Sequence, residues 1–289
     1  MMRNGHCQRG GGRSALVSLL AVMAVCTLPA EATRASIVAY WNFNDNFAAY
    51  VGGSSYNLTP VNGASIEAVA AKFGAGGADF QRTSSQYAFV DNAVVVASGS
   101  DFSYSAWYYL DLADITGSSR YFVLEATNGT LNNTQSHPIS LGLRDQGAGD
   151  VAQIYTSVNN DSDVFYSFDT EPNQSWHNVI TTFNATTRTI TTYFDGTEVK
   201  QETASGELDP GNGLVVGGHR AGTGRNWEGY IDDVAIWDEV IDSAEIARLQ
   251  TQPVVPVPEP TALALCGIAA AGLGFAGVGR GWGCRRAKT

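Results

Sequence analysis

One aspartate near the end of the sequence lies where a β-strand is expected to bury its side chain. Asp232, Val234 and Ile236 alternate along the segment, so a strand points all three side chains to one side. If that side is the core, the Asp232 carboxylate is buried. Burying a carboxylate is costly unless it accepts hydrogen bonds or binds a cation. Asp232 is therefore a candidate metal ligand or, alternatively, an acceptor for backbone N–H groups at the strand end.

Carboxylate pairs that hydrolyse glycosidic bonds are not evident in the sequence. Retaining glycosidases need two carboxyl groups about 5 Å apart, and the spacing Glu-x-Asp-x-Glu on one strand face is a common way to supply them. That spacing does not occur here. Glu228 is close in sequence to Asp232 and Asp233, but these residues fit a closing strand better than an active pair. A divergent glycoside hydrolase or polysaccharide lyase is kept as an alternative function.

Other catalytic patterns are also missing from the sequence. His137, His177 and His219 are dispersed and form no His-Glu-x-x-His or His-x-His pattern for zinc. No Gly-x-Ser-x-Gly motif marks a nucleophilic serine, although residues that meet only in the fold can still form a Ser-His-Asp arrangement. The glycines between residues 217 and 224 follow a strand without a helix, which argues against a phosphate-binding loop.

Aromatic side chains offer a better prospect for ligand binding. Sugars stack on flat aromatic faces, while Asn, Asp and Gln side chains hydrogen-bond to their hydroxyl groups. Trp107, Tyr108 and Tyr109 are consecutive, so at least one of them points away from the core. The other candidates are Trp227, Tyr155 and Tyr166. Core packing is the alternative for each of these aromatics.

Short alternating runs predict an all-β body. Runs rich in Thr, Val, Tyr and Phe recur and are broken by Gly, Asn, Asp and Ser. The clearest hairpin joins residues 189–194 to residues 197–201 through Asp195 and Gly196. This dipeptide suits a type I′ turn because both central residues need positive φ. Many strands at this spacing predict a two-sheet sandwich or jelly roll.

One short helix is expected after the last strand. Asp242 is its N-cap, and Glu245 stands three positions later, as in a capping box. Ile246 and Leu249 would share the buried face of this helix. The Pro-rich stretch 251–260 then predicts a stiff, extended linker.

Composition limits the class of partner. Residues 33–252 contain 10 Lys plus Arg and 26 Asp plus Glu, a net charge of −16, which argues against nucleic acid and anionic lipid as partners. The same carboxylates are available for calcium, although plain solubility also explains most of them. All four cysteines (Cys7, Cys26, Cys266 and Cys284) lie outside this body. The body therefore has neither an internal disulfide nor a thiolate metal site.

Both ends of the chain carry targeting features. Arg3, Arg9 and Arg13 precede an apolar stretch, and a small-x-small site ends at Ala32, so residues 1–32 are predicted to be a cleaved secretory signal peptide. At the other end, Pro258-Glu259-Pro260 precedes an apolar run over residues 261–278 and a basic tail. This run of 18 residues is just long enough to span a bilayer as a helix.

The order of Pro-Glu-Pro, apolar segment and basic tail resembles the PEP-CTERM sorting signal of Gram-negative bacteria. The resemblance implies export, temporary anchoring in the inner membrane through residues 261–279, and processing by an exosortase-type enzyme. A permanent C-terminal transmembrane anchor is the alternative. Either way, the body is expected to work at the cell surface or outside the cell.

Ordered segments of the body resemble the laminin-G-like or concanavalin A-like jelly roll. They include Tyr-Trp-Asn-Phe-Asn-Asp ending at Asp45, Trp176-His177 with the later Asp195-Gly196, and Ile-Asp-Asp-Val around Asp232. The matching ranges are 38–45, 72–74, 78–80, 87–90, 101–107, 175–179, 193–196, 229–237 and 244–246. The resemblance implies an all-β, two-sheet antiparallel jelly-roll sandwich with one short C-terminal helix.

The same resemblance implies a structural calcium ion. Secreted jelly rolls of this type often hold calcium near the position of Asp232, with groups from the first strand, for which Asp45 and neighbouring carbonyls are the candidates. Calcium takes six to eight oxygen ligands, which carboxylates, carbonyls and water can supply together. Hydrogen bonding of Asp232 to backbone amides, without a metal, is the alternative.

These observations predict four regions: a signal peptide (1–32), a jelly-roll domain (33–250), a linker with the Pro-Glu-Pro motif (251–260) and a sorting segment (261–289). The expected function is that of an exported, non-enzymatic surface or matrix protein whose domain binds extracellular polysaccharide or mediates adhesion. A structural envelope component without a specific ligand is a further alternative.

Overall fold

The computed structural model describes residues 35–112, 120–131, 138–144, 153–158, 162–168, 174–205, 208–222 and 224–254. The predicted signal peptide, the Pro258-Glu259-Pro260 motif and the segment 261–289 lie outside these residues. Within the described ranges, no helix has both the length and the apolar character needed to cross a membrane.

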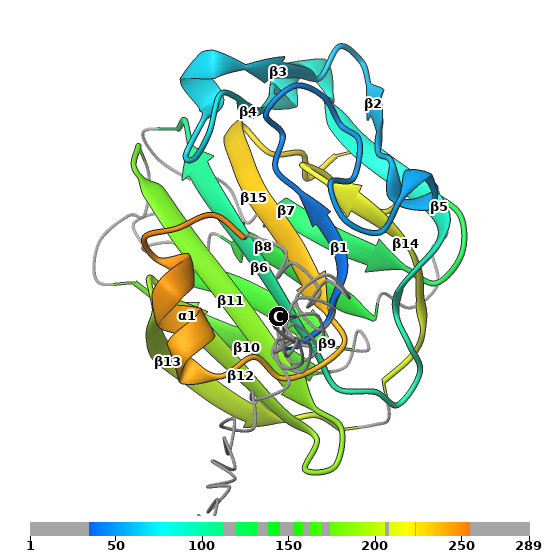
Figure 1. Cartoon of the computed structure of the whole chain (residues 1–289), viewed down its shortest axis with the longest axis vertical. Helices are drawn as coiled ribbons and strands as arrows, with labels where there is room; N and C mark the ends of the chain where they lie inside the picture. Colours follow the sequence, from blue (N-terminus) through cyan, green and yellow to red (C-terminus); the bar gives the residue numbers. More distant parts are fainter. Residues whose placement is uncertain are drawn as a thin grey trace, which may run out of the picture. The chain divides into compact units, whose positions relative to one another are not determined.

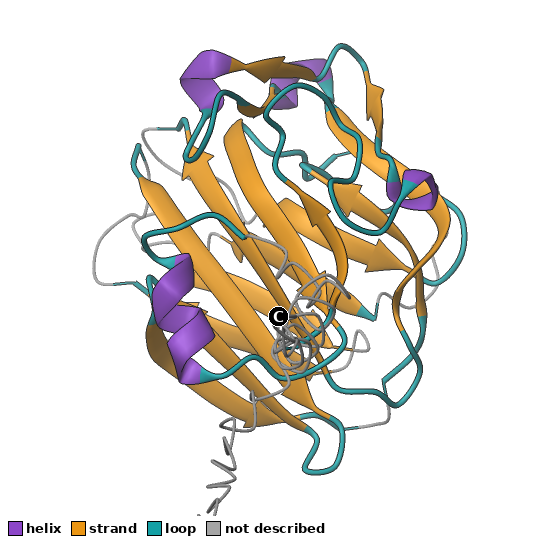
Figure 2. Cartoon of the chain, in the orientation of Figure 1, coloured by secondary structure: helices purple, strands orange, loops and turns teal. Residues whose placement is uncertain are grey.

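Two antiparallel sheets make up the domain (Figures 1 and 2), as the sequence predicts. In the described residues the first sheet has eight strands: β13 (Thr197–Thr203), β12 (Thr189–Phe194), β11 (Trp176–Asn184), β6 (Phe102–Leu110), β15 (Gly229–Trp237), β4 (Gly77–Phe80) and β3 (Ser65–Glu67) in spatial order, with β1 (Ile37–Trp41) paired to β15. Neighbours in space are often far apart in sequence, which is the jelly-roll pattern of crossing connections.

The second sheet lies behind the first in the view of Figure 1. Its seven described strands, in spatial order, are β10 (Ser162–Ser167), β9 (Gln153–Val158), β8 (Ile139–Arg144), β7 (Arg120–Thr127), β14 (Gly211–Val216), β5 (Tyr87–Val96) and β2 (Thr59–Val61). Short 3-10 turns occur at η1 (Ser54–Tyr56), η2 (Ala68–Ala70) and η3 (Arg82–Ser84).

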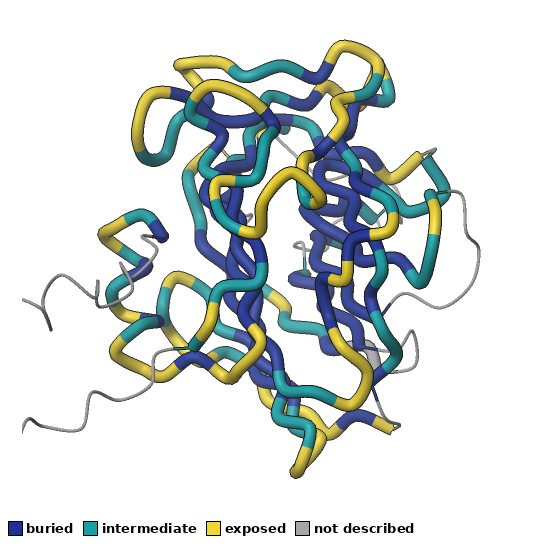
Figure 3. The backbone as a smooth tube through the Cα atoms, turned by 45° about the vertical axis from the view of Figure 1, so that its right-hand side comes forward, coloured by how far each residue is buried: buried dark blue, intermediate teal, exposed yellow. Residues whose placement is uncertain are grey.

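The main hydrophobic core fills the space between the sheets, where buried segments of both layers face each other (Figure 3). Strand β6 shows how alternation builds it. Every second residue from Phe102 to Leu110 belongs to the main core and is at most 1% exposed, while the residues that alternate with these point to the outer face of the first sheet. The outer face of this sheet is therefore where side chains of β6, β11 and β15 can meet a ligand.

The β12–β13 hairpin confirms the predicted turn. Asp195 and Gly196 connect the two strands with φ values of 47° and 77°. Positive φ at both central residues is the type I′ requirement, and its twist matches that of the strands.

Helix α1 (Ser243–Leu249) covers part of the outer face of the first sheet (Figure 1). Asp242 caps it by accepting a hydrogen bond from the Glu245 N–H at 2.8 Å, and Ile246 and Leu249 are buried, as predicted. The Glu245 carboxylate, however, pairs with Arg248, at 2.7 Å, and does not close a capping box.

The start of the predicted linker packs on this sheet. Val254 is only 1% exposed and lies in the hydrophobic cluster under α1. The Arg248 guanidinium donates a hydrogen bond to the Pro253 carbonyl, at 2.8 Å. Residues 251–254 are thus part of the packed structure, because Val254 adds to the hydrophobic cluster that Ile246 and Leu249 of the helix form on the sheet.

Candidate functional site

Three aromatic side chains form a row across the outer face of the first sheet. Trp176 of β11 and Tyr230 of β15 lie directly opposite Tyr109 of β6, one on each side. The centroid of the Tyr109 ring is 5.9 Å from that of Trp176 and 5.3 Å from that of Tyr230. All three are half-buried. Directly opposed residues on neighbouring antiparallel strands share a face, so the sheet itself aligns these rings.

The aromatic row (Trp176, Tyr109 and Tyr230) ends at a carboxylate. Asp79 of β4 lies opposite Tyr230 in the next strand pair. Burial raises the pKa of Asp79, and three nearby carboxylates add to the effect. These carboxylates belong to Glu67, Glu228 and Asp111. Half-buried aromatic rings beside hydrogen-bond acceptors suit a ligand that has both apolar faces and hydroxyl groups.

Asp232 does not share a side with Val234 and Ile236, so the prediction from simple alternation is wrong. A β-bulge between Asp232 and Ala235 shifts the register against β6, and Asp233, which lies within it, has a φ of 53°. Ile231 and Val234 both point into the main core. The extra residue of the bulge therefore turns Asp232 to the outer face, opposite Trp107.

The Asp232 carboxylate is buried among backbone donors. It accepts hydrogen bonds from the N–H groups of Lys72 (2.8 Å), Phe73 (3.0 Å) and Asp233 (2.8 Å). Burial raises its pKa to about 7, although the hydrogen bonds act in the opposite direction. Bonding to backbone amides was the alternative that the sequence left open.

A calcium ion is a poor fit to the groups seen at Asp232. Its oxygens face three N–H donors, whereas calcium needs oxygen ligands. Asp45 is exposed, and no hydrogen bond joins it to Asp232 in the described part of the chain. Groups of three or more His, Cys, Asp or Glu side chains that could hold a metal are also missing from those residues. Calcium at Asp232 and Asp45 stays a prediction.

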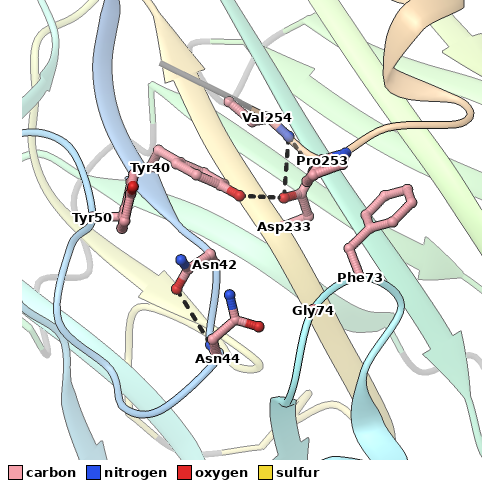
Figure 4. Close-up of a pocket in the computed structure, with 9 residues that line it drawn as sticks. All are labelled: Tyr40, Asn42, Asn44, Tyr50, Phe73, Gly74, Asp233, Pro253 and Val254. Atoms are coloured by element: carbon pink, nitrogen blue, oxygen red, sulfur yellow. Dashed lines mark hydrogen bonds between the residues drawn. The ribbon is translucent and has the colours of Figure 1, made fainter. Parts of the chain in front are cut away.

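Asp233, which lies within the bulge, lines a cavity of about 270 Å³ on the same face (Figure 4). Its carboxylate accepts a hydrogen bond from the Tyr40 hydroxyl at 2.6 Å and another from the Val254 N–H at 3.0 Å. Burial raises its pKa to about 6. Simple alternation along the strand predicts that the Asp233 side chain points to the side opposite Asp232, and nothing in the sequence indicates a bulge.

A Ser-His-Asp chain does form in the fold. The Ser175 Oγ lies 2.7 Å from the His177 Nε2, and the His177 Nδ1 lies 2.8 Å from the Asp195 Oδ2. Asp195 also accepts a hydrogen bond from the Asn178 N–H at 2.8 Å, and the His177 ring stacks on Phe194. Asp195 is a turn residue of the β12–β13 hairpin. We therefore infer that these hydrogen bonds hold the turn against β11.

Most aromatics singled out in the sequence are core residues. Tyr108, Trp227 and Tyr155 are at most 1% exposed, and Trp107 is covered by Lys72, whose Nζ lies 3.9 Å from its ring centroid. Tyr109 alone joins the aromatic row. Tyr166 is half-buried and packs against the core with Phe168. Trp176 and Tyr230 were missed because their proximity depends on strand pairing, although both stood in segments already assigned to strands.

These features define a two-sheet jelly-roll domain with a partly exposed aromatic row. Residues 82–247 match the family Laminin_G_3, described as the concanavalin A-like lectin/glucanases superfamily. The match covers more than half of the chain, so the protein belongs to this family. A search of curated proteins gave no match.

Similar solved structures include sugar complexes. Domain 4 of AbnA, a GH43 extracellular arabinanase from Geobacillus stearothermophilus, in complex with arabinotriose, has a TM-score of 0.55 and 15% identity, covering 75% of this chain and 100% of that one. The ligand-binding domain of botulinum neurotoxin serotype D, in complex with N-acetylneuraminic acid, has a TM-score of 0.52 and 15% identity. This chain spans about half of the neurotoxin structure. At these identities the likeness defines the fold alone.

Proposed function

We propose that the protein is an exported surface or matrix protein whose domain binds a carbohydrate chain on the aromatic row. The observation that carries this proposal is that three half-buried rings from opposed positions on adjacent strands gather at one place on the outer face. Aromatic side chains supply large contact areas at low entropic cost, and they stack on the C–H faces of sugar rings. The sugar complexes among the similar structures support the proposal at the level of the fold.

Rigid placement adds to this support. The row lies on central strands of an eight-stranded sheet, so binding requires no ordering of a loop. The ring centroids of Trp176 and Tyr230 are 6.4 Å apart, close to their distances from Tyr109, so the three rings converge in one compact aromatic cluster. An open cluster of this kind suits a sugar unit of a chain that lies across it better than a small molecule that must be enclosed.

Truncation of side chains in the aromatic row is expected to weaken carbohydrate binding. We expect Trp176→Ala and Tyr230→Ala each to weaken binding of a polysaccharide at least tenfold, about 1.4 kcal/mol, because each loses one stacking surface. A glycan array identifies the ligand, and titration calorimetry then compares the variants. Phe89→Ala is the matched control, since Phe89 is a half-buried aromatic on β5 of the other sheet.

Two results would decide against this role. If the wild-type protein binds neither a glycan of the array nor the extracellular polysaccharide of the producing cell, the result favours a structural role in the envelope. A change in the cell surface after deletion of the gene would support that role further. If the row variants bind as well as Phe89→Ala does, the ligand lies elsewhere on the domain.

A carbohydrate-cleaving activity is the second candidate function, and one observation favours it. Asp79 has a raised pKa, and further carboxylates lie near it at the end of the aromatic row. A protonated carboxyl group near an ionised one is the arrangement of glycosidases. Release of reducing ends from a bound polysaccharide, and its loss in Asp79→Asn, would establish the enzyme. Binding without release supports the non-enzymatic role.

Export and processing form the second part of the proposal, and they rest on the sequence of the two ends. We expect the mature protein to start near Thr33 and to have lost its C-terminal segment after handling by an exosortase-type enzyme at Pro258-Glu259-Pro260. Intact-mass and terminal-peptide measurements on protein from the producing cell check both ends. An untrimmed chain in the cytosol would exclude export, and a trimmed start with an intact end would indicate a permanent anchor.

A further inference from the structure

A cavity on the outer face of the first sheet is separate from the aromatic row. It lies between β1, the loop at Phe73–Gly74 and the segment Pro253–Val254, and it measures about 270 Å³ (Figure 4). On β15, its floor residue Asp233 is three positions beyond Tyr230, which corresponds to about 10 Å along a strand. The cavity and the row are thus neighbouring but distinct parts of one face.

Two strained backbone positions shape this cavity. Phe43 follows β1 with a φ of 45°, and Asp233 has a φ of 53° on the neighbouring strand. Neither residue is Gly, and the left-handed region costs such residues roughly 1–2 kcal/mol each. At Phe43 this conformation buries the ring in the core, while Asn42 and Asn44 on either side both line the cavity. Strain of this kind gathers at ligand sites, where it fixes side chains in place.

The two asparagines present amide NH₂ groups to the cavity. The Asn42 Oδ1 accepts a hydrogen bond from the Asn44 N–H at 3.3 Å, and the Asn44 Oδ1 accepts one from the Ala75 N–H at 2.6 Å. Both side-chain oxygens are therefore used, and this fixes the orientation of the amides with each Nδ2 left as the donor. Gly74, with a φ of 71°, faces Asn44 so closely that a Cβ would clash with it.

The rest of the lining combines acceptors with apolar walls. Asp233 and the Tyr40 hydroxyl form a polar floor, and Phe73 and Val254 line the sides. Tyr50 is at the edge and is 64% exposed, which is unusual for so large a ring. Among the residues that the structure describes, no Lys, Arg or His side chain lines the cavity.

We propose that this cavity binds one neutral, hydroxyl-rich ring, a single sugar or cyclic polyol unit. Two fixed NH₂ donors, a carboxylate acceptor and aromatic edges are the groups that recognise adjacent hydroxyls and a C–H face. The volume of the cavity is just below the range of pockets that bind drug-sized ligands, so the cavity has room for one ring and not for a chain. An acidic sugar is disfavoured, because the buried Asp233 carboxylate would face it and the nearby Arg248 guanidinium is already paired with Glu245 and with the Pro253 carbonyl. This proposal does not depend on polysaccharide binding by the row.

The test is titration of the purified, ¹⁵N-labelled protein with single neutral sugars and cyclic polyols, and with glucuronate as the acidic comparison. The readout is the side-chain amide signals of Asn42 and Asn44. Saturable shifts are expected with at least one neutral ring and none with glucuronate. Asn44→Ala and Tyr50→Ala are each expected to weaken this binding at least fivefold. Tyr50→Ala removes an exposed side chain, so it keeps the test valid if Asn44→Ala fails to fold.

The aromatic row supplies the control. Trp176→Ala is expected to leave the titration with single rings unchanged. The proposal is overturned if no neutral ring gives a saturable shift, if both cavity variants bind as the wild type does, or if Trp176→Ala removes the response. The last outcome would place the single ring on the aromatic row.

Discussion

Replacement of Glu125 by Ala is expected to lower the free energy of unfolding by about 3–5 kcal/mol. The Glu125 side chain is fully buried on β7, yet it pairs with Arg220, whose guanidinium and backbone N–H each donate to it at 2.6 Å. Burial raises the pKa of Glu125 more than Arg220 lowers it. Removal of the carboxylate leaves a largely buried guanidinium without this partner, which is the costly way to break a buried pair.

We attribute the loss of stability to the missing partner of Arg220 and not to the missing packing of the Glu125 side chain. A second variant separates these two causes. In Glu125→Gln with Arg220→Met, both charges are removed while the amide oxygen can still accept from the backbone N–H of residue 220, and we expect stability within about 1 kcal/mol of the wild type or above it. Urea unfolding followed by tryptophan fluorescence measures both variants. A double variant as unstable as Glu125→Ala would mean that the ion pair itself contributes the stability.

Local patterns were sufficient to predict the fold class and its elements. Alternation along β6 and the Asp195-Gly196 turn depend on residues close in sequence, and each was predicted correctly. The cap of α1 by Asp242 is equally local. The order of the strands was not predicted, because pairs such as β6 with β15 join residues more than a hundred positions apart.

The candidate site was predicted only in part, because register and bulges are non-local. The position of Tyr109 in an aromatic row follows from its pairing with Trp176 and Tyr230, which alternation within one strand does not contain. Asp232 was expected to be buried, which is correct, but on the wrong side. One extra residue at a bulge reverses every later side chain, and no residue near Asp233 announces it.

Asp232 and Asp233 are expected to lower stability as the pH rises from about 4 to 7, opposite to the behaviour of salt-bridged carboxylates. His219, whose pKa burial lowers to about 4, offsets part of this fall. Burial raises the folded-state pKa of Asp232 to about 7 and that of Asp233 to about 6, both from 3.8. Between these values the folded state holds more protons than the unfolded state, so ionisation favours unfolding. The shift of about 2 units at Asp233 alone corresponds to about 3 kcal/mol. Denaturant unfolding at each pH measures the slope.

Asp233→Asn isolates this effect from the other carboxylates of the domain. Its amide oxygen can still accept the hydrogen bond from the Tyr40 hydroxyl, while its NH₂ group replaces the oxygen that accepts from the Val254 N–H. The loss of that bond lowers stability by an amount that does not depend on pH, and the side chain cannot ionise. We expect the difference in unfolding free energy, variant minus wild type, to rise from pH 4 to pH 7 and then to level off. A difference that does not change with pH would show that Asp233 ionises in the folded protein as easily as in water.

The same measurement tests the predicted calcium ion. A cation bound at Asp232 would hold its carboxylate ionised and lower its pKa, so the fall in stability between pH 4 and 7 would become shallower. The profile is therefore measured once with a chelator and once with excess calcium. Identical profiles mean that the three backbone N–H groups are the partners of Asp232 in solution. A profile that calcium flattens in the wild type, and not in Asp45→Ala, would support the calcium site at Asp232 and Asp45.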